Sequence, residues 1–199
     1  MSDISLPEPT ETAIAARWQP LVGGTVIWVF MTVEVLTFGM FLLWHAASWR
    51  QDPAGFAAAQ AHLDVASGAL GTVLLVLGSA AAYLAVLARE RGANRRAAGW
   101  LLAGAGMGVL FTLNKLREYA PHLAAGLSLS SHPFWFSYYF LTFLHLLHVI
   151  AGVVVFCVLA WRARRGTLAL QPIEAGAAYW HLVDVIWLLL FSILYGMHP

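Results

Sequence analysis

The chain has 199 residues, of which 60% are hydrophobic and 11% are charged. Soluble domains carry about 25% charged residues, and so much apolar surface would aggregate in water, which excludes an ordinary soluble fold. The net charge of +1 provides no field that would attract nucleic acid or a strongly acidic partner. The single cysteine, Cys157, excludes an intrachain disulfide and a multi-cysteine metal site.

Residues 1–20 form a polar segment ahead of the apolar part of the chain. Pro7 and Pro9 would interrupt a helix. Asp3 and Glu8 are unlike the basic start of a secretory signal peptide. We expect residues 1–20 to be disordered and residues 21–199 to form one membrane domain.

Five apolar stretches follow, each long enough to cross a bilayer as a helix, which takes about 20 residues. In chain order they are residues 21–48, 65–88, 97–116, 134–161 and 177–197. The connections at 49–64 and 118–132 contain proline and are predicted to be loops. The sequence therefore predicts an all-α integral membrane bundle of five transmembrane helices.

The orientation of the bundle is predicted from its arginines. Seven of them lie in the connections after the second and fourth spans: Arg89, Arg91, Arg95, Arg96, Arg162, Arg164 and Arg165. Short loops rich in arginine stay on the cytoplasmic side of the membrane. This predicts that the N-terminus is inside and the C-terminus is outside.

The third span contains a pattern of small residues. Gly104 and Gly108 are four residues apart, so they share one face of a helix. Such a face lets two helix backbones approach closely in a membrane. We interpret both glycines as packing residues.

Glu34 lies near the middle of the first span, where an ionisable group costs about 2.5–3.5 kcal/mol on insertion scales. A group that bears this cost usually faces other helices and has a partner there. Two interpretations are consistent with its chemistry. Glu34 either takes up and releases protons, or it is a neutral acid that donates one buried hydrogen bond in a structural role.

His145 and His148 lie near the middle of the fourth span, on one helix face. They cannot both ligate one heme iron, because axial ligands approach from opposite sides, so a heme would need a histidine from another span, such as His45 or His181. Di-metal bundles use Glu-x-x-His motifs, and the sequence has none. Hydrogen-bonded packing is the interpretation for this pair, and we expect the chain to bind no metal or cofactor.

Two further polar groups lie at span ends. His181 and Asp184 share a face at the start of the fifth span, just after Glu174. They are predicted to form a charge-assisted pair that anchors the helix, with a proton antenna as the alternative. At the end of the third span, Lys115 and Arg117 are predicted to reach the interface, one of them pairing with Glu118, which Tyr119 follows.

No nucleophile–base pair, phosphate loop, dinucleotide fingerprint or metalloprotease motif is present in the sequence. The residues alone therefore predict a polar-centred helix bundle without a catalytic site of its own. Two alternatives remain. One is a membrane anchor that holds heme b between spans or associates with quinone, and the other is a small proton-coupled transporter.

Four segments carry a resemblance to a known family: residues 28–41, 115–119, 141–152 and 174–187. The last reads Glu-x-Gly-x-x-Tyr-Trp-His-Leu-Val-Asp-Val-Ile-Trp and is the most specific. In this order the segments resemble subunit III of cytochrome c oxidase, the accessory subunit of the heme–copper oxidases. Many members of that family have seven spans, whereas this sequence has five.

The resemblance implies an accessory subunit of the bacterial inner membrane that supports assembly, stability and proton delivery. The heme and the copper or non-heme iron are expected in the catalytic partner subunit. The positions that carry over are Glu34, His145, His148, Glu174, His181 and Asp184. Within the family, the sequence is most similar to short accessory proteins of nitric oxide reductase, on its length, Lys115, the Tyr138-Tyr139-Phe140 run and the Leu194-Tyr195 ending.

Overall fold

The computed structural model describes residues 25–196, and the prediction of disorder for residues 1–20 lies outside them. The described residues form six helices and no strand: α2 (Thr25–Trp49), α3 (Pro53–Gln60), α4 (Val65–Glu90), α5 (Asn94–Ala124), α6 (Pro133–Arg164) and α7 (Leu170–Tyr195). All except α3 are long and apolar enough to cross a membrane. The prediction of an all-α bundle with five spans is confirmed.

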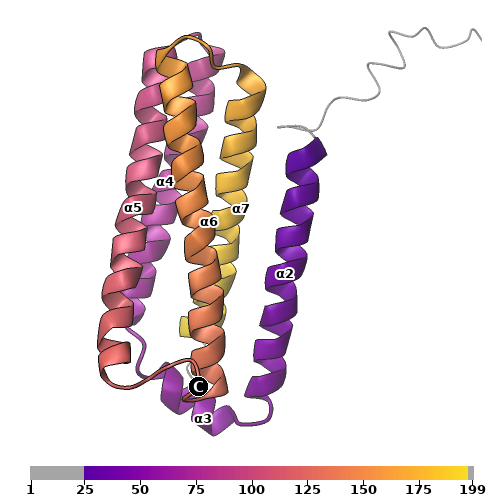
Figure 1. The fold of residues 1–199 in the computed structure, drawn as a ribbon, viewed down its shortest axis with the longest axis vertical. Helices are drawn as coiled ribbons and strands as arrows, with labels where there is room; N and C mark the ends of the chain where they lie inside the picture. Colours follow the sequence, from indigo (N-terminus) through magenta and orange to yellow (C-terminus); the bar gives the residue numbers. More distant parts are fainter. Residues whose placement is uncertain (1–24, 197–199) are drawn as a thin grey trace, which may run out of the picture.

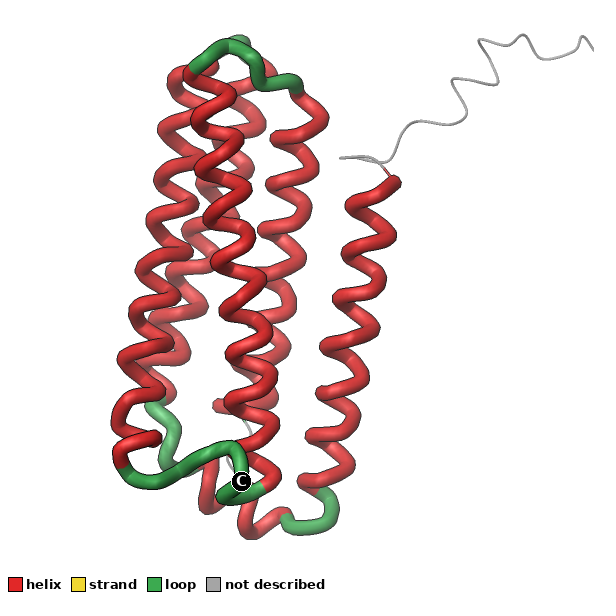
Figure 2. The backbone as a smooth tube through the Cα atoms, in the orientation of Figure 1, coloured by secondary structure: helices red, strands yellow, loops and turns green. Residues whose placement is uncertain are grey.

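Helices α4 to α7 form a four-helix bundle in which successive helices run in opposite directions (Figure 1). Helix α2 stands beside α6 and α7, and the short α3 lies across one end of the bundle (Figure 1). The connections are short, as the tube in Figure 2 shows. Both arginine-bearing connections lie at the same end, where Arg89 Nε donates to the Leu168 carbonyl at 2.8 Å.

The prediction of a loop over residues 49–64 is wrong for residues 53–60, which form α3. Pro53 occupies its first turn, where a missing N–H costs nothing. Asp52 caps the helix by accepting from the Gly55 N–H at 3.0 Å, and it also bonds to His132, the N-cap residue of α6, at 3.1 Å. The Gly55 N–H and His132 hold the pKa of the Asp52 carboxyl below its usual range, so the cap is ionised at neutral pH.

Two long helices extend further than the apolar pattern predicts. Helix α5 continues to Ala124 through Pro121, so the loop predicted over 118–132 is wrong for residues 118–124. Helix α7 begins at Leu170 and not at residue 177, because Pro172 falls in its first turn and is tolerated there. Glu174 is therefore part of a helix. Polar residues that hydropathy assigned to loops therefore belong to helices.

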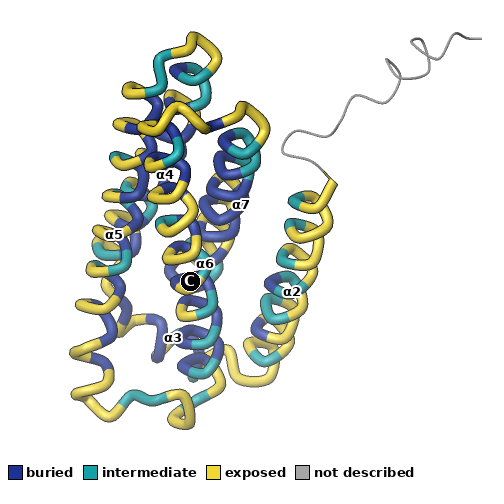
Figure 3. Tube along the Cα trace, turned by 45° about the horizontal axis from the view of Figure 1, so that its top comes forward, coloured by how far each residue is buried: buried dark blue, intermediate teal, exposed yellow. Residues whose placement is uncertain are grey.

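The bundle is apolar on much of its outside and carries polar groups inside, as expected for a protein whose solvent is lipid. Exposed residues run along the outer faces of the helices (Figure 3), and many of them have large hydrophobic side chains. Lys115, Glu118 and His145 are buried among α4 to α7. Helix α2 is far more exposed than the others, with Phe38 and His45 as its buried residues. It therefore joins the four-helix bundle along one narrow stripe.

Trp180 of α7 is packed against glycines of three other helices. A Cβ atom at Gly78 of α4 would lie 2.7 Å from its ring, one at Gly108 of α5 2.8 Å, and one at Gly152 of α6 3.0 Å. The indole also stacks on Phe156 at 4.8 Å between ring centroids. A large residue in the centre of the bundle thus requires glycine on each facing helix. Gly104 is likewise buried, against Phe156 and the Gly78 carbonyl.

The glycine packing predicts opposite effects for two substitutions on one helix. Gly108→Ala places a methyl group 2.5 Å from Val153 Cγ2 and is expected to lower stability by about 1–3 kcal/mol, the usual cost of overpacking. Gly106→Ala meets nothing within 4 Å and is expected to be neutral or stabilising by up to about 1 kcal/mol through helix propensity. Thermal unfolding of the purified chain in detergent measures both, and equal effects would contradict the packing.

Candidate functional site

The densest polar cluster in the described structure centres on Glu118 of α5. Its Oε1 atom lies 3.1 Å from Lys115 Nζ of the same helix. It accepts a 2.6 Å hydrogen bond from the Tyr138 hydroxyl of α6 and a very short one from the Tyr195 hydroxyl of α7. Its Oε2 atom accepts from Ser67 of α4 at 2.9 Å. One carboxylate therefore joins all four helices of the bundle.

The hydrogen positions in this cluster can be counted. Lys115 Nζ donates to Glu118, to the Tyr138 hydroxyl at 3.3 Å and to the Tyr195 hydroxyl at 2.7 Å, which uses all three ammonium hydrogens. The hydroxyl groups of Tyr138 and Tyr195 each donate a hydrogen bond to Glu118 Oε1. Every donor has an acceptor when Lys115 is charged and Glu118 is ionised. The cluster is thus a saturated ion pair, which suits a fixed structural role.

The surroundings of Lys115 contradict its predicted position at the membrane interface. Its side chain is fully buried, and the ammonium lies 5.0–5.4 Å from the ring centroids of Tyr119, Tyr138, Trp187 and Tyr195. Aromatic faces stabilise a cation that has left water. Lys115 pairs with Glu118 as predicted, but it does so inside the bundle because α5 continues nine residues beyond it. Arg117 is the exposed member of the two.

Tyr119 extends the cluster toward the centre of α6. The Thr142 hydroxyl donates a hydrogen bond to the Tyr138 carbonyl at 2.5 Å. In the 2.7 Å hydrogen bond between Tyr119 and Thr142, the Tyr119 hydroxyl is therefore the donor and Thr142 Oγ1 the acceptor. Tyr119 is buried, as is Thr142. Glu118 and Tyr119, which end one of the four segments that carry the resemblance, therefore fix α5 to α6 through two separate hydrogen bonds.

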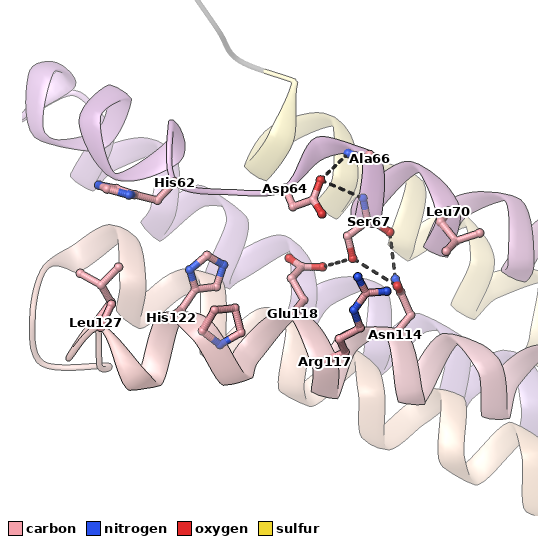
Figure 4. Close-up of a pocket in the computed structure, with 12 residues that line it drawn as sticks. His62, Asp64, Ala66, Ser67, Leu70, Asn114, Arg117, Glu118, His122 and Leu127 are labelled. Carbon is pink, nitrogen blue, oxygen red and sulfur yellow. Dashed lines mark hydrogen bonds between the residues drawn. The ribbon is translucent and has the colours of Figure 1, made fainter.

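A pocket of about 580 Å³ opens beside the cluster at the α3 end of the bundle (Figure 4). Glu118, Ser67 and Asn114 line it, together with Arg117 and two histidines, His62 and His122. Asp64, also in the lining, caps α4 through the N–H groups of residues 66 and 67. Acidic and basic groups are balanced here, so the pocket does not favour a ligand of either charge.

A second ionic contact joins α2 to the bundle. Glu34 Oε2 lies 2.9 Å from His148 Nε2 of α6, and both side chains are mostly buried, with 14% and 16% exposed. His148 Nδ1 lies 2.7 Å from the Leu144 carbonyl, which can only accept, so Nδ1 carries a hydrogen. The Glu34–His148 contact then holds one further proton, on either the carboxyl or the imidazole. Unlike the Glu118 cluster, this pair has two protonation arrangements with the same heavy-atom geometry.

His145 behaves differently from its neighbour. It is fully buried, and neither ring nitrogen has a hydrogen-bond partner among residues 25–196. Its ring packs against Trp187 at 5.3 Å, Phe111 at 5.6 Å and Phe38 at 6.5 Å. His145 therefore lies between the Glu34 contact and the aromatic wall of the Lys115 site, as a core residue.

The predicted hydrogen bond between His181 and Asp184 does not form, although the two groups still interact electrostatically at longer range. Asp184 is buried, and its Oδ2 atom accepts from Ser79 of α4 at 2.9 Å. His181 is exposed on the outer surface of α7. The two residues are three positions apart on α7, but only Asp184 lies on the part of the helix surface that is buried against α4. Glu174 lies on the same outer groove as His181.

The part of the chain that the structure describes has no group of three or more histidine, cysteine or acidic residues that would hold a metal ion. His45, one of the histidines considered for heme, is buried at the α2 end near α3 and bonds to Ser137 at 2.7 Å. The Ser137 hydroxyl donates its hydrogen bond to the Phe134 carbonyl, so His45 Nδ1 is the donor in its hydrogen bond to Ser137 Oγ. This contact fixes the lower part of α2 to α6.

Comparison with known proteins decides the family. The sequence profile described as cytochrome c oxidase subunit III matches residues 23–197. The chain belongs to the cytochrome c oxidase subunit III family. All the site residues described in this subsection lie within the matched range.

Relatives of similar length support the assignment. The chain is 27% identical to a probable cytochrome c oxidase subunit 3 of Mycobacterium tuberculosis over 177 residues, which cover 86% of this chain and 85% of that protein. It is 28% identical to cytochrome c oxidase subunit 3 of Corynebacterium diphtheriae, covering 94% and 93%. Members of this family with the same length as this chain therefore occur among cytochrome c oxidase subunits.

A third relative has a different organisation. The chain is 31% identical over 182 residues to the heme–copper oxidase subunit I+III of Aeropyrum pernix, covering 86% of this chain and 22% of that protein. By its name, that protein joins subunits I and III in one polypeptide. The region similar to this chain is there part of a much larger chain.

Sequence reasoning missed the partners that complete both ionic contacts. Tyr138 and Tyr195 were singled out only for the subgroup resemblance, and Ser67 was not considered. The pairing of Glu34 with His148 had a usable signal, since Glu34 is the tenth of 25 residues in α2 and His148 the sixteenth of 32 in α6. Both lie near mid-depth, and an unpaired acid at that depth is costly.

The saturated ion pair predicts a non-additive double substitution. Lys115→Met leaves Glu118 as an isolated buried charge and is expected to cost about 3–5 kcal/mol. Adding Glu118→Gln removes that charge while keeping an acceptor for both phenols, so the double variant is expected to be more stable than Lys115→Met alone. Thermal unfolding in detergent measures the cycle.

The matched control is Arg117→Met, which removes an exposed cation two residues away and is expected to change stability by less than about 0.5 kcal/mol. Additive losses in the double variant would contradict the ion pair.

Proposed function

We propose that this chain is the accessory, non-catalytic subunit of a heme–copper oxidase-type respiratory complex, where it stabilises the catalytic subunit. The match to subunit III over residues 23–197 carries this proposal. The Aeropyrum pernix relative supports it, because its name places subunits I and III in one chain. The heme and the copper or non-heme iron belong, in this proposal, to the partner, and the polar residues of this chain serve structure and proton transfer.

The two ionic contacts have separate roles in this function. The Glu118 cluster fixes α4 to α7 as one rigid body, because every hydrogen in it is committed to an acceptor. The Glu34–His148 pair joins α2 to that body and holds one movable proton. We assign stability to the first and proton handling to the second. His145, beside both, supports them by packing.

The finer proposal is that the partner is a nitric oxide reductase and that the chain serves denitrification. Three residues cited for this subgroup, Lys115, Tyr138 and Tyr195, meet at Glu118 and form one connected unit. They would therefore be inherited together. The five-helix length does not distinguish the two partners, since the Mycobacterium tuberculosis oxidase subunit has nearly the same length.

The proposed location is the bacterial inner membrane, crossed five times. The end of the bundle that carries both arginine-rich connections would face the cytoplasm, because positive loops are retained there. This orientation puts the start of α2 inside and the end of α7 outside.

Purification of the tagged chain from its native membranes in mild detergent tests the function. A heme–copper catalytic subunit is expected to co-purify in equal amount, and its identity separates an oxidase from a nitric oxide reductase. Reduced-minus-oxidised spectra should place the heme bands with the partner. A b-type heme band from the chain expressed alone would instead support the heme anchor, and solute-driven proton uptake in liposomes would support the transporter.

The proton-sharing pair predicts a specific phenotype for Glu34→Gln. An amide donates to His148 Nε2 with the same geometry but does not release a proton, so the complex is expected to assemble at the wild-type level. During sustained turnover it is expected to lose activity several times faster than the wild type. Glu34→Leu leaves His148 unpaired, at a cost of about 1–3 kcal/mol, and is expected to reduce assembly as well. Wild-type durability of the Glu34→Gln complex would contradict proton handling.

A further inference from the structure

His181 is an exposed histidine at the middle of a transmembrane helix. It is the twelfth of the 26 residues in α7, within the membrane-spanning helix and on the arginine-rich side of Asp184. Among the described residues, it is the only exposed acidic, basic or histidine residue within six positions of the midpoint of its helix. It forms no hydrogen bond or ion pair within that part of the chain. A polar group at this depth normally faces other protein, since lipid offers it no partner.

The surface around His181 is a groove between α4 and α7. It has a volume of about 230 Å³ and is lined by Tyr83, Val86, Glu174, Ala177, Ala178 and His181. Glu174 lies about two helical turns from His181 along α7. Between them the half-buried Ala178 keeps the helix surface low, which lets a further helix approach closely. The groove thus combines a small surface residue with two polar groups of α7 and Tyr83 of α4.

The outer faces elsewhere on the bundle are different. The groove between α5 and α6 is lined by Val109, Thr112, Leu113, Ile150, Val153 and Val154, and Thr112 uses its hydroxyl on its own backbone. The outer face of α2 likewise has hydrophobic residues and two threonines bonded to their own helix. Within residues 25–196, neither face has a polar group that needs a further hydrogen-bond partner, so lipid can cover both. Of these three faces in the described part of the chain, the α4–α7 groove is the one that has polar groups without a hydrogen-bond partner.

We propose that the α4–α7 groove is the docking site for a transmembrane helix of the catalytic subunit. This rests on the proposed function and specifies the face on which it operates. The partner helix is expected to present a hydroxyl or amide to His181 and a hydrogen-bond donor to Glu174 nearer the arginine-rich end. Small side chains on it would face Ala178.

Photo-crosslinking in native membranes tests the face directly. The photoreactive residue p-benzoylphenylalanine replaces Ala178 in one tagged variant and Val154 in another. Val154 lies at a similar depth on the α5–α6 face and is 57% exposed, so it is the matched control. Irradiation is expected to join the catalytic subunit to position 178 and not to position 154.

The outcomes separate the docking face from the function. Co-purification of the catalytic subunit with crosslinks from position 154 only, or with a second copy of this chain crosslinked at position 178, would overturn the docking face and leave the function standing. Absence of any co-purifying catalytic subunit would overturn the proposed function, and the docking face with it.

A substitution pair tests the role of His181 itself. His181→Leu is expected to reduce the catalytic subunit retained after a detergent wash at least about fivefold, the change that loss of one interface hydrogen bond produces. The thermal stability of the isolated chain is expected to change little, because His181 forms no direct hydrogen bond or ion pair in it and only a longer-range electrostatic interaction with Asp184 is lost. Cys157→Leu, at an exposed position of α6, is the control and should retain the partner fully. Equal retention by both variants would overturn the role of His181.

Discussion

The bundle depends on one buried ion pair. Lys115 and Glu118 leave water together, and a buried pair of this kind is stable only when its remaining donors and acceptors are satisfied. Tyr138, Tyr195 and Ser67 supply those partners from three other helices, so α4, α6 and α7 must each approach α5 in one register. Helices in lipid lack a hydrophobic force that would select such a register. The polar cluster selects it, and the glycines around Trp180 allow the approach.

The second ionic contact has a different design on a different helix. The Glu118 cluster is saturated and joins four well-packed helices, whereas the Glu34–His148 pair, to which we assign one movable proton in the proposed function, joins the exposed α2 to them. A proton that shifts between carboxyl and imidazole changes the charge on each group at the contact without moving any heavy atom. In the proposed function, rigidity and proton handling are therefore assigned to separate places in the bundle.

The apolar runs predicted all five spans because lipid imposes length and composition on each helix by itself. Helix α3 was missed, since eight residues of which four are alanine give no periodic signal. The interior position of Lys115 was missed because hydropathy ended the third span at residue 116, while α5 continues to Ala124. The pairs Glu34–His148 and Ser79–Asp184 depend on how each helix is rotated about its axis, which is set by packing between helices and not by the sequence of either one.

The central claim is that Glu118 is ionised and serves structure, and infrared spectroscopy of the purified complex at neutral pH tests it most directly. The difference spectrum between the wild type and Glu118→Gln is predicted to show loss of carboxylate stretching bands, with no loss in the region of protonated carboxyl groups. Loss of a protonated carboxyl band would contradict the account, because it would show that Glu118 carries a proton and that Lys115 has no charged partner.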